Sequence, residues 1–308
     1  MLTSAVGTRT EARPAYRAFR ARVVRTEQLS PSFRRITFGG AELAGFGTAG
    51  LDQRVKVVLP HPEHGYAHYP FGPDWYGDWR ALPAERRNTF RTYTVRAVRP
   101  AVAEVDIDFV GHGDTGPASA WAGRAVVGDE IVIVGPDELS EGRESGIDWR
   151  PGAVERVLLV GDETAVPAAC AILESLPAGA RGAAILEVPE AGDRLRVAAP
   201  AGVRVQWLAR RSGQSHGELL LPAVREHLGL AAAPGDAAVA TTVGAEGEDV
   251  EELWDVPEGR VDGEFYAWLA GEASAIRALR RVLVQEAGVD RRRVAFMGYW
   301  RRGKAELD

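Results

Sequence analysis

The sequence predicts a β-barrel followed by an α/β domain, two folds joined in one chain of 308 residues. Residues 17–135 alternate short apolar runs with turns, which is the pattern of a small antiparallel barrel. Beyond residue 153, apolar strands alternate with helical stretches, which is the pattern of a parallel sheet with helices on both faces. The Gly-, Ser- and Glu-rich stretch 138–151 has the composition of a linker or flap. We therefore expect two domains, at 17–145 and 153–308.

The first domain carries six segments with the composition of strands and one short helical insert. Within 105–109, Val105, Ile107 and Phe109 alternate with aspartates, so the three apolar side chains share one face of a strand. Six antiparallel strands are enough to close a small barrel. The predicted strands are 21–26, 33–38, 54–59, 91–98, 104–109 and 130–134.

The second domain has the alternation expected of a nucleotide-binding type of fold. Its predicted strands are 157–160, 183–188, 203–208, 267–270 and 294–298, with 237–241 as a candidate for one more short strand. Its predicted helices are 165–175, 216–227 and 272–286. The acidic segment 244–256 is expected to be an exposed loop.

Composition excludes several classes of protein. The net charge of −6 argues against nucleic-acid binding, and no run approaches the roughly 18 apolar residues of a membrane span. Residues 1–15 lack the apolar core of an export signal, so we expect a cytoplasmic protein without stable membrane insertion. Cys170 is the single cysteine, which excludes an internal disulfide, a cysteine-rich zinc site and an iron–sulfur cluster. Redox chemistry would therefore need an organic cofactor or a metal held by other ligands.

The segment Arg91-Thr92-Tyr93-Thr94 suits a flavin nucleotide. On a strand, Arg91 and Tyr93 point to one face and Thr94 to the other. The tyrosine offers a planar partner for the flavin ring, and the arginine offers a cation for the phosphates. Thr94 would offer a hydroxyl or an amide to the flavin edge. The alternative interpretation is an ordinary barrel strand with charged ends.

The following segment, 108–122, has the pattern of a pyrophosphate site. Three glycines let the backbone approach a ligand closely, and Pro117 suits the first turn of a helix. A helix N-terminus presents unbonded amides to an anion, and Ser119 would add a hydroxyl. His112 either contacts the nucleotide or hydrogen-bonds within the loop. An ordinary strand-turn-helix connection is the alternative.

In the second domain, Gly161-Asp162-Glu163-Thr164 follows a buried strand, at the edge where such sheets bind ligands. The alternative is a simple helix start, with Thr164 as N-cap. The tail 299–304 sets two aromatic residues beside three cations, which suits an anionic complex or a packed basic terminus. His61, His64 and His68 lie in a segment broken by Pro and Gly, and we expect no metal site there.

Taken together, these motifs resemble the siderophore-interacting protein family, FAD-dependent ferric-siderophore reductases of the ferredoxin-reductase-like superfamily. The resemblance spans about residues 17–306 and includes Arg54-Val55-Lys56-Val57. It implies that Lys56 and Arg301 bind the siderophore. Asp137 stands where the family often has a glycine or a basic residue, so the resemblance leaves a third basic contact with the siderophore open. The cofactor-binding residues that the resemblance implies are Arg91, Tyr93, Thr94, Val110, His112, Gly116, Ala118, Ser119, Asp162, Thr164 and Ala165, with Glu163 in the same signature.

The function implied by the resemblance is reduction of Fe(III) in ferric siderophores to Fe(II) through bound FAD. The electron donor would be NADH, NADPH or reduced ferredoxin, and iron would be released in the cytoplasm. The flavin would carry the redox step, so no catalytic side chain and no metal ligand is expected. The alternatives are a general flavin reductase with another acceptor and a siderophore-binding protein without turnover.

Overall fold

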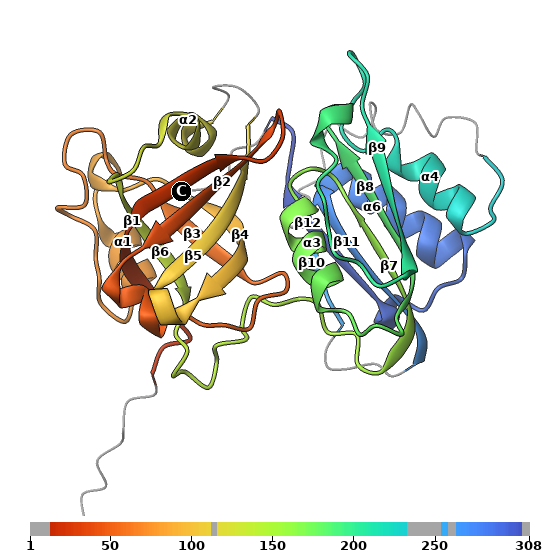
Figure 1. Ribbon diagram of the computed structural model, residues 1–308, viewed down its shortest axis with the longest axis horizontal. Helices are drawn as coiled ribbons and strands as arrows, with labels where there is room; N and C mark the ends of the chain where they lie inside the picture. Colours follow the sequence, from red (N-terminus) through yellow and green to blue (C-terminus); the bar gives the residue numbers. More distant parts are fainter. Residues whose placement is uncertain (1–12, 112–115, 233–253, 258–262, 304–308) are drawn as a thin grey trace, which may run out of the picture.

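The computed structural model describes residues 13–111, 116–232, 254–257 and 263–303. Within them, a barrel built from the first half of the chain lies beside an α/β body built from the second half (Figure 1). The predicted fold class is therefore confirmed. No helix in the described ranges combines the length and the apolar character needed to cross a membrane.

The barrel is a closed sheet of six antiparallel strands in the order β1-β2-β5-β4-β3-β6. Its first strand is much longer than predicted, because its first half pairs with β6 and its second half with β2. The strands are β1 (Tyr16–Gln28), β2 (Phe33–Gly39), β3 (Arg54–Val58), β4 (Phe90–Arg99), β5 (Glu104–Val110) and β6 (Glu130–Pro136). The helices between them are η1 (Ala41–Gly45), α1 (Trp75–Ala81), η2 (Ala84–Arg86), η3 (Pro100–Val102) and α2 (Pro117–Arg124).

The alternation predicted on β5 is present in the barrel. Val105, Ile107 and Phe109 lie in its apolar core, together with Ala118, Trp121 and Ala122 of α2, which packs against that core. The intervening aspartates face the other way but are also buried. Arg35 forms a bidentate pair with Asp108, at 2.7 and 2.8 Å, and Arg99 does the same with Asp106. These pairs satisfy carboxylates that burial would otherwise destabilise.

The second sheet has six strands in the order β10-β12-β11-β7-β8-β9. All neighbours are parallel except β10, which runs antiparallel to β12, so the sheet is mixed rather than purely parallel. Residues 244–253 of the expected exposed loop 244–256 lie outside the described residues, and the expectation was wrong at the loop's end, since Trp254 forms β10 and stacks on Tyr299. The strands are β7 (Val154–Gly161), β8 (Arg181–Val188), β9 (Gly202–Ala209), β10 (Trp254–Asp255), β11 (Gly263–Glu272) and β12 (Val294–Trp300).

Helices cover both faces of this sheet, as predicted. The helix α3 lies on the face turned toward the barrel, and α4 and α6 lie on the opposite face (Figure 1). The predicted helix 216–227 begins only at Leu220, because Gly217 has a φ of 79° and forms a turn against Ala275. The predicted strand 237–241 lies outside the described residues. The helices are α3 (Val166–Ser175), η4 (Ala191–Asp193), α4 (Leu220–His227), α6 (Ala273–Arg280), the π-helical η5 (Arg281–Glu286) and η6 (Arg291–Arg293).

Polar contacts tie the barrel to the second body. The Asp193 carboxylate accepts hydrogen bonds from the Ser30 hydroxyl and the Ser32 amide, both at 2.7 Å. Arg96 of β4 pairs with Glu174 of α3 at 2.6 Å. The predicted linker is not loose throughout, since Ile147, Asp148 and Trp149 are buried between the two halves.

Candidate functional site

The predicted site residues fall into two groups, one on the barrel and one at the edge of the second sheet. On the barrel, Lys56 of β3 lies opposite Thr92 of β4 in the ladder. The Lys56 ammonium donates a hydrogen bond of 2.5 Å to the Thr92 hydroxyl and lies 5.2 Å from the ring centre of Phe90. The structure therefore places this cation directly beside the predicted flavin strand.

Along β4, the predicted residues have different surroundings. Tyr93 packs against the barrel core, with its ring 4.5 Å from that of Phe109. Arg91 donates a hydrogen bond of 2.6 Å to the carbonyl of Phe90, and Thr94 is buried. A cofactor on this strand would meet an aromatic ring and a guanidinium on adjacent positions of one face.

The start of α2 fits a phosphate group. No side chain caps the helix at Gly116, its first turn has no acid, and a Cβ atom on Gly116 would meet nothing within 4 Å. The side chain of Ala118 is buried in the barrel, so it would offer only its amide, and the Ser119 hydroxyl donates to the Val110 carbonyl at 3.4 Å. An uncapped helix start of this kind is suited to an anion. The predicted residue His112 lies outside the described residues.

The second group surrounds Asp162, where β7 ends. Its Oδ1 accepts hydrogen bonds from the amide of Thr164 at 2.9 Å and from the Thr164 hydroxyl at 2.5 Å. Its Oδ2 accepts from the Glu272 amide at 2.7 Å and from Trp300 Nε1 at 2.9 Å. Burial and the neighbouring Glu163 raise the pKa of Asp162 to about 6. Thr164 is not the N-cap of α3, because that position is taken by Ala165, which is fully buried.

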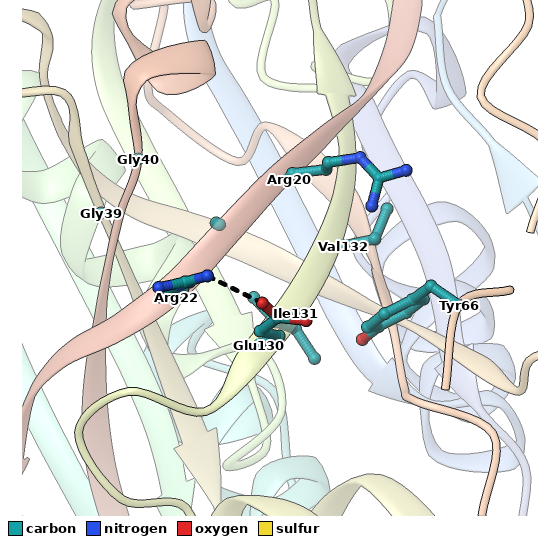
Figure 2. Close-up of a pocket in the computed structure, with 9 residues that line it drawn as sticks. Arg20, Arg22, Gly39, Gly40, Tyr66, Glu130, Ile131 and Val132 are labelled. Atoms are coloured by element: carbon teal, nitrogen blue, oxygen red, sulfur yellow. Dashed lines mark hydrogen bonds and ion pairs between the residues drawn. The ribbon is translucent and has the colours of Figure 1, made fainter. Parts of the chain in front are cut away.

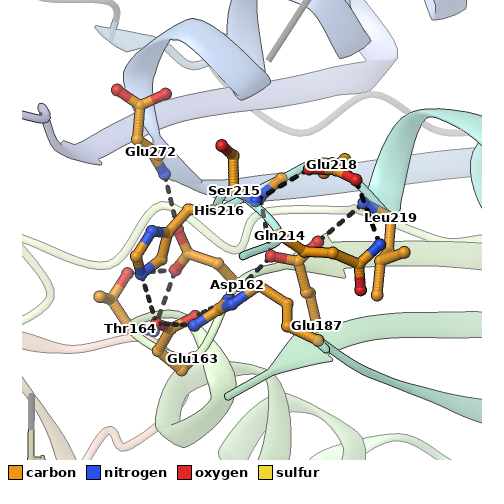
Figure 3. Close-up of polar contacts among 12 residues, drawn as sticks. Asp162, Glu163, Thr164, Glu187, Gln214, Ser215, His216, Glu218, Leu219 and Glu272 are labelled. Atoms are coloured by element: carbon orange, nitrogen blue, oxygen red, sulfur yellow. Dashed lines mark hydrogen bonds and ion pairs between the residues drawn. The ribbon is translucent and has the colours of Figure 1, made fainter. Parts of the chain in front are cut away.

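Next to Asp162, a charged network spans the ends of three strands (Figure 3). Arg210 forms a bidentate pair with Glu163, at 2.6 and 2.7 Å, and reaches Glu187 with one nitrogen at 2.8 Å. His216 Nε2 lies 2.9 Å from the same Glu163 carboxylate. Burial opposes ionisation of Glu163, but the hydrogen bonds from Arg210 and His216 outweigh it and lower its pKa to about 2. Burial raises the pKa of Glu187, which a single Arg210 nitrogen reaches.

The two groups approach one another through aromatic residues. Arg54, on the same outward-facing row of β3 as Lys56, lies 4.2 Å from the ring centre of Trp254. The Trp254 ring stacks on Tyr299 at 5.8 Å, two residues before Arg301. This series of contacts brings the strand that carries Lys56 beside the strand that leads to Arg301.

Asp137 serves the barrel rather than a ligand. Its carboxylate pairs with Arg13 at 2.7 Å and with Arg17 at 3.2 Å, and only 2% of its side chain is exposed. Burial opposes ionisation, but hydrogen bonds led by that from Arg13 lower the pKa of Asp137. The acid therefore fastens the start of β1.

Two other features lie away from both groups. A pocket on the barrel is lined by β1, β2 and β6, and the Arg22–Glu130 pair lies along it (Figure 2). None of the predicted site residues lines that pocket. The rings of His61, His64 and His68 contact one another in sequence, at 4.9 and 5.2 Å. Within the described part of the chain, no group of three or more His, Cys, Asp or Glu residues has metal-holding geometry.

Sequence reasoning missed the partners of the acidic signature, namely Glu187, Arg210, His216 and Glu272. One signal was available, since Glu187 is an acid inside the otherwise apolar run 183–188 of β8. The positions of the other three depend on strand order, which a single sequence does not reveal.

Two family models together match most of the chain. Residues 22–139 match the family described as the siderophore-interacting FAD-binding domain. Residues 154–303 match the family described as siderophore-interacting protein.

Individual proteins agree with these matches. The ferric vibriobactin reductase of Vibrio cholerae is 30% identical over 286 residues, which cover 92% of this chain and 89% of that protein. The crystal structure of a siderophore-interacting protein of Aeromonas hydrophila is also 30% identical, with a TM-score of 0.67 and coverage of 95% and 94%. A ferredoxin reductase of carbazole 1,9a-dioxygenase, at 14% identity and a TM-score of 0.56, shares the fold over 92% of this chain and 70% of its own.

Proposed function

Because the chain belongs to the siderophore-interacting protein family, we propose that it uses bound FAD to reduce Fe(III) in ferric siderophores to Fe(II). The observation that carries the proposal is the arrangement of elements around β4. There an uncapped helix start, an Arg-x-Tyr-Thr strand and a lysine lie on neighbouring elements. The strand that leads to Arg301 approaches β3, the neighbour of β4, from the second body.

The residues of the barrel would hold the cofactor. Arg91 and the amides at the start of α2 would bind phosphates, with the Ser119 hydroxyl beside them. Tyr93 would face the flavin ring, and Thr94 would meet its edge. When bound, FAD supplies the redox step, which takes a hydride from NADH or NADPH and delivers single electrons to iron. We assign the remaining implied contacts to Val110, His112, Gly116, Ala118, Asp162, Thr164 and Ala165.

Lys56 and Arg301 would bind the substrate. A ferric tris-catecholate is a trianion, so cations on both sides of the seam between the two bodies would attract and orient it. Ferrous iron binds hard oxygen ligands more weakly than ferric iron, so reduction releases the metal, in the cytoplasm on this proposal. Asp137 adds no third cation, which would favour chelates that two basic groups suffice to hold.

An anaerobic absorption experiment tests the proposed function. The purified protein should show oxidised-flavin bands that bleach with NADH, NADPH or reduced ferredoxin and return when a ferric siderophore is added with a ferrous trap. Bands that bleach but do not return with the chelate would favour a general flavin reductase. A protein that binds chelate but holds no FAD would instead be a siderophore-binding protein without turnover.

Two variants test the assigned residues. Arg91→Ala should purify with less FAD, and a full complement would remove Arg91 from the phosphate site. Lys56→Glu should raise the apparent KM for an anionic chelate about tenfold without slowing flavin reduction by the donor. Arg292→Glu is the matched control, because this exposed arginine precedes β12, at the strand's other end from Arg301.

A further inference from the structure

The end of β12 leaves the regular ladder just before Arg301. Gly298 pairs with Gly271 of β11, but the next pair joins Trp300 to Glu272, so Tyr299 is an extra residue in a bulge. A bulge of this kind redirects the side chains that follow it. Tyr299 consequently packs against Trp254 and Trp268, while the indole of Trp300 reaches Asp162.

The neighbouring backbone is shaped to admit the Asp162 carboxylate. A Cβ atom on Gly271 would lie 2.7 Å from Asp162 Oδ2, so any other residue there would push the acid away. Asp162 is 1% exposed, and both of its oxygens accept hydrogen bonds from the protein, two each. It would have to give up one of these bonds to touch a ligand directly.

The same indole is held from a second direction. The His216 ring lies edge-on to the Trp300 ring, with centres 4.8 Å apart at 81°, and His216 contacts Glu163. The consecutive carboxylates Asp162 and Glu163 therefore both restrain Trp300, one directly and one through a histidine (Figure 3 shows the acids and His216). Because the two acids are consecutive in the sequence, both restraints act on the same side chain, that of Trp300.

Arg301 lies between two restrained residues. Before it, Trp300 donates to Asp162, and after it, the amide of Arg302 approaches Glu272 Oε1 at 3.4 Å. The amide of Glu272 itself donates to Asp162, so both restraints lead back to one carboxylate. The Arg301 side chain makes no ion pair with any residue that the structure describes. Its guanidinium therefore starts from a fixed backbone and remains available to an anion.

We propose that Asp162 is a positioning residue for the substrate: by holding Trp300 and Glu272 it fixes the backbone from which Arg301 reaches an anionic ferric chelate. The inference rests on the proposed function, in which Arg301 contacts the chelate. Its physical basis is preorganisation, because a cation held in place before binding loses less conformational freedom when the ligand arrives.

The test separates binding from electron transfer by using gallium. Ga(III) chelates match the ferric complexes in size and charge but are not reduced by flavins. Affinities would be measured by calorimetry for the Ga(III) tris-catecholate trianion and for a neutral Ga(III) tris-hydroxamate. Each protein would also be checked for FAD content and melting temperature.

Trp300→Phe is the decisive variant, because it keeps an aromatic ring and removes only the indole and its N–H donor. It should weaken binding of the trianion about fivefold, change binding of the neutral chelate less than about twofold, and leave FAD content unchanged. Asp162→Asn should weaken binding of the trianion in the same way, and its FAD content is measured separately because Asp162 is also assigned a contact with the cofactor. Tyr299→Phe is the matched control, because the Tyr299 hydroxyl is buried without a hydrogen-bond partner in the described structure.

Arg301→Ala separates the two levels of the proposal. If Arg301→Ala alone leaves affinity for the trianion unchanged, the proposed substrate contact fails. If Arg301→Ala weakens binding but Trp300→Phe does not, the positioning role is overturned and the proposed function stands. Equal weakening of both chelates by Trp300→Phe would also overturn it. In the Arg301→Ala background, Trp300→Phe should have no further effect, and this result does not require that Asp162→Asn folds.

Discussion

Two buried acids, Glu163 and Asp52, are stabilised by different kinds of hydrogen-bond donor. Glu163, at the edge of the second sheet, is neutralised by the guanidinium of Arg210 and by His216. Asp52, between the barrel and the second sheet, accepts hydrogen bonds from the amides of Asp148 and Trp149 and from Trp268 Nε1 at 2.9 Å, all neutral donors. Burial consequently raises the pKa of Asp52 to about 6, whereas that of Glu163 falls to about 2.

The two acids differ in which parts of the molecule they join and in the pH range over which they are charged. The Glu163 cluster joins strands of one sheet, and Glu163 itself stays charged at pH values well above 2. The Asp52 carboxylate joins the predicted linker to the second sheet and changes its protonation in mild acid. A protonated carboxylic acid still accepts hydrogen bonds on one oxygen, so the Asp52 contacts between the two halves would survive protonation. An ion pair would be lost when its acid is protonated.

The largest effect is expected when the cation of the Glu163 cluster is removed. Arg210→Leu leaves two buried glutamates without their shared partner, so it should lower the free energy of unfolding by about 3–5 kcal/mol. Urea denaturation at pH 7 would measure the loss. Arg292→Leu, at an exposed pair, should give no measurable change. A small loss in Arg210→Leu would mean that the glutamates find other partners.

A second prediction concerns acid. Because the folded pKa of Glu163 is depressed, its stabilising contribution is complete above pH 4.5 and is lost as pH falls toward about 2. The stability advantage of the natural protein over Glu163→Gln should therefore shrink across that window, by roughly 3 kcal/mol in total. Urea denaturation at pH 6, 4 and 3 would follow it. A difference that does not depend on pH would show that Glu163 is not ionised by its partners.

Asp52 should show the opposite sign. Its folded pKa is raised, so the folded state takes up a proton before the unfolded state does, and the natural protein gains stability relative to Asp52→Asn as pH falls from about 7 to 4. The gain should be somewhat smaller than the Glu163 effect. Asp162, whose pKa is also raised to about 6, titrates in the same pH window. Its contribution is present in both the natural protein and Asp52→Asn, so it cancels in the difference between them. Urea denaturation of both proteins at pH 7, 5.5 and 4 would measure the gain. A stability advantage of the natural protein that shrinks as the pH falls would reject the raised pKa of Asp52.

The smallest effect is expected at the contact between the β1–β2 turn and Asp193. Ser30→Ala removes one donor to this buried carboxylate and the acceptor of the Phe33 amide but leaves the Ser32 amide in place, so a loss of about 1 kcal/mol is expected. Ser175→Ala removes a hydroxyl that bonds only within its own helix and should cost less. Equal losses in the two variants would mean that the Ser30 contact adds nothing across the seam.

The sequence was informative where local chemistry decides the outcome. Alternation placed Val105, Ile107 and Phe109 on the inner face of β5, and apolar runs located the central strands of both sheets. It was less informative where partners come from far along the chain. The two-residue strand at Trp254 is recognisable only by its pairing with β12, and the turn at Gly217 delays α4.

The candidate site shows the same division. The predicted motifs carry the residue types that a flavin and an anion require, and a single sequence shows these residue types directly. The hydrogen bonds of Asp162 are not, because Glu272 and Trp300 lie 110 and 138 residues away and meet it only through the order of β7, β11 and β12. Likewise, nothing near Arg210 indicates that it serves two glutamates at once.

The scarcity of lysine has a practical consequence for work on this protein. The sequence contains only Lys56 and Lys304, and Lys56 lies on β3 beside the strand that carries the flavin motif. Amine-directed reagents therefore have few lysine side chains to modify, and one of them, Lys56, lies at the proposed substrate site. Protection of Lys56 from such a reagent by a bound chelate would report on occupancy of the seam, whereas modification of Lys56 would itself remove a cation proposed to bind the substrate.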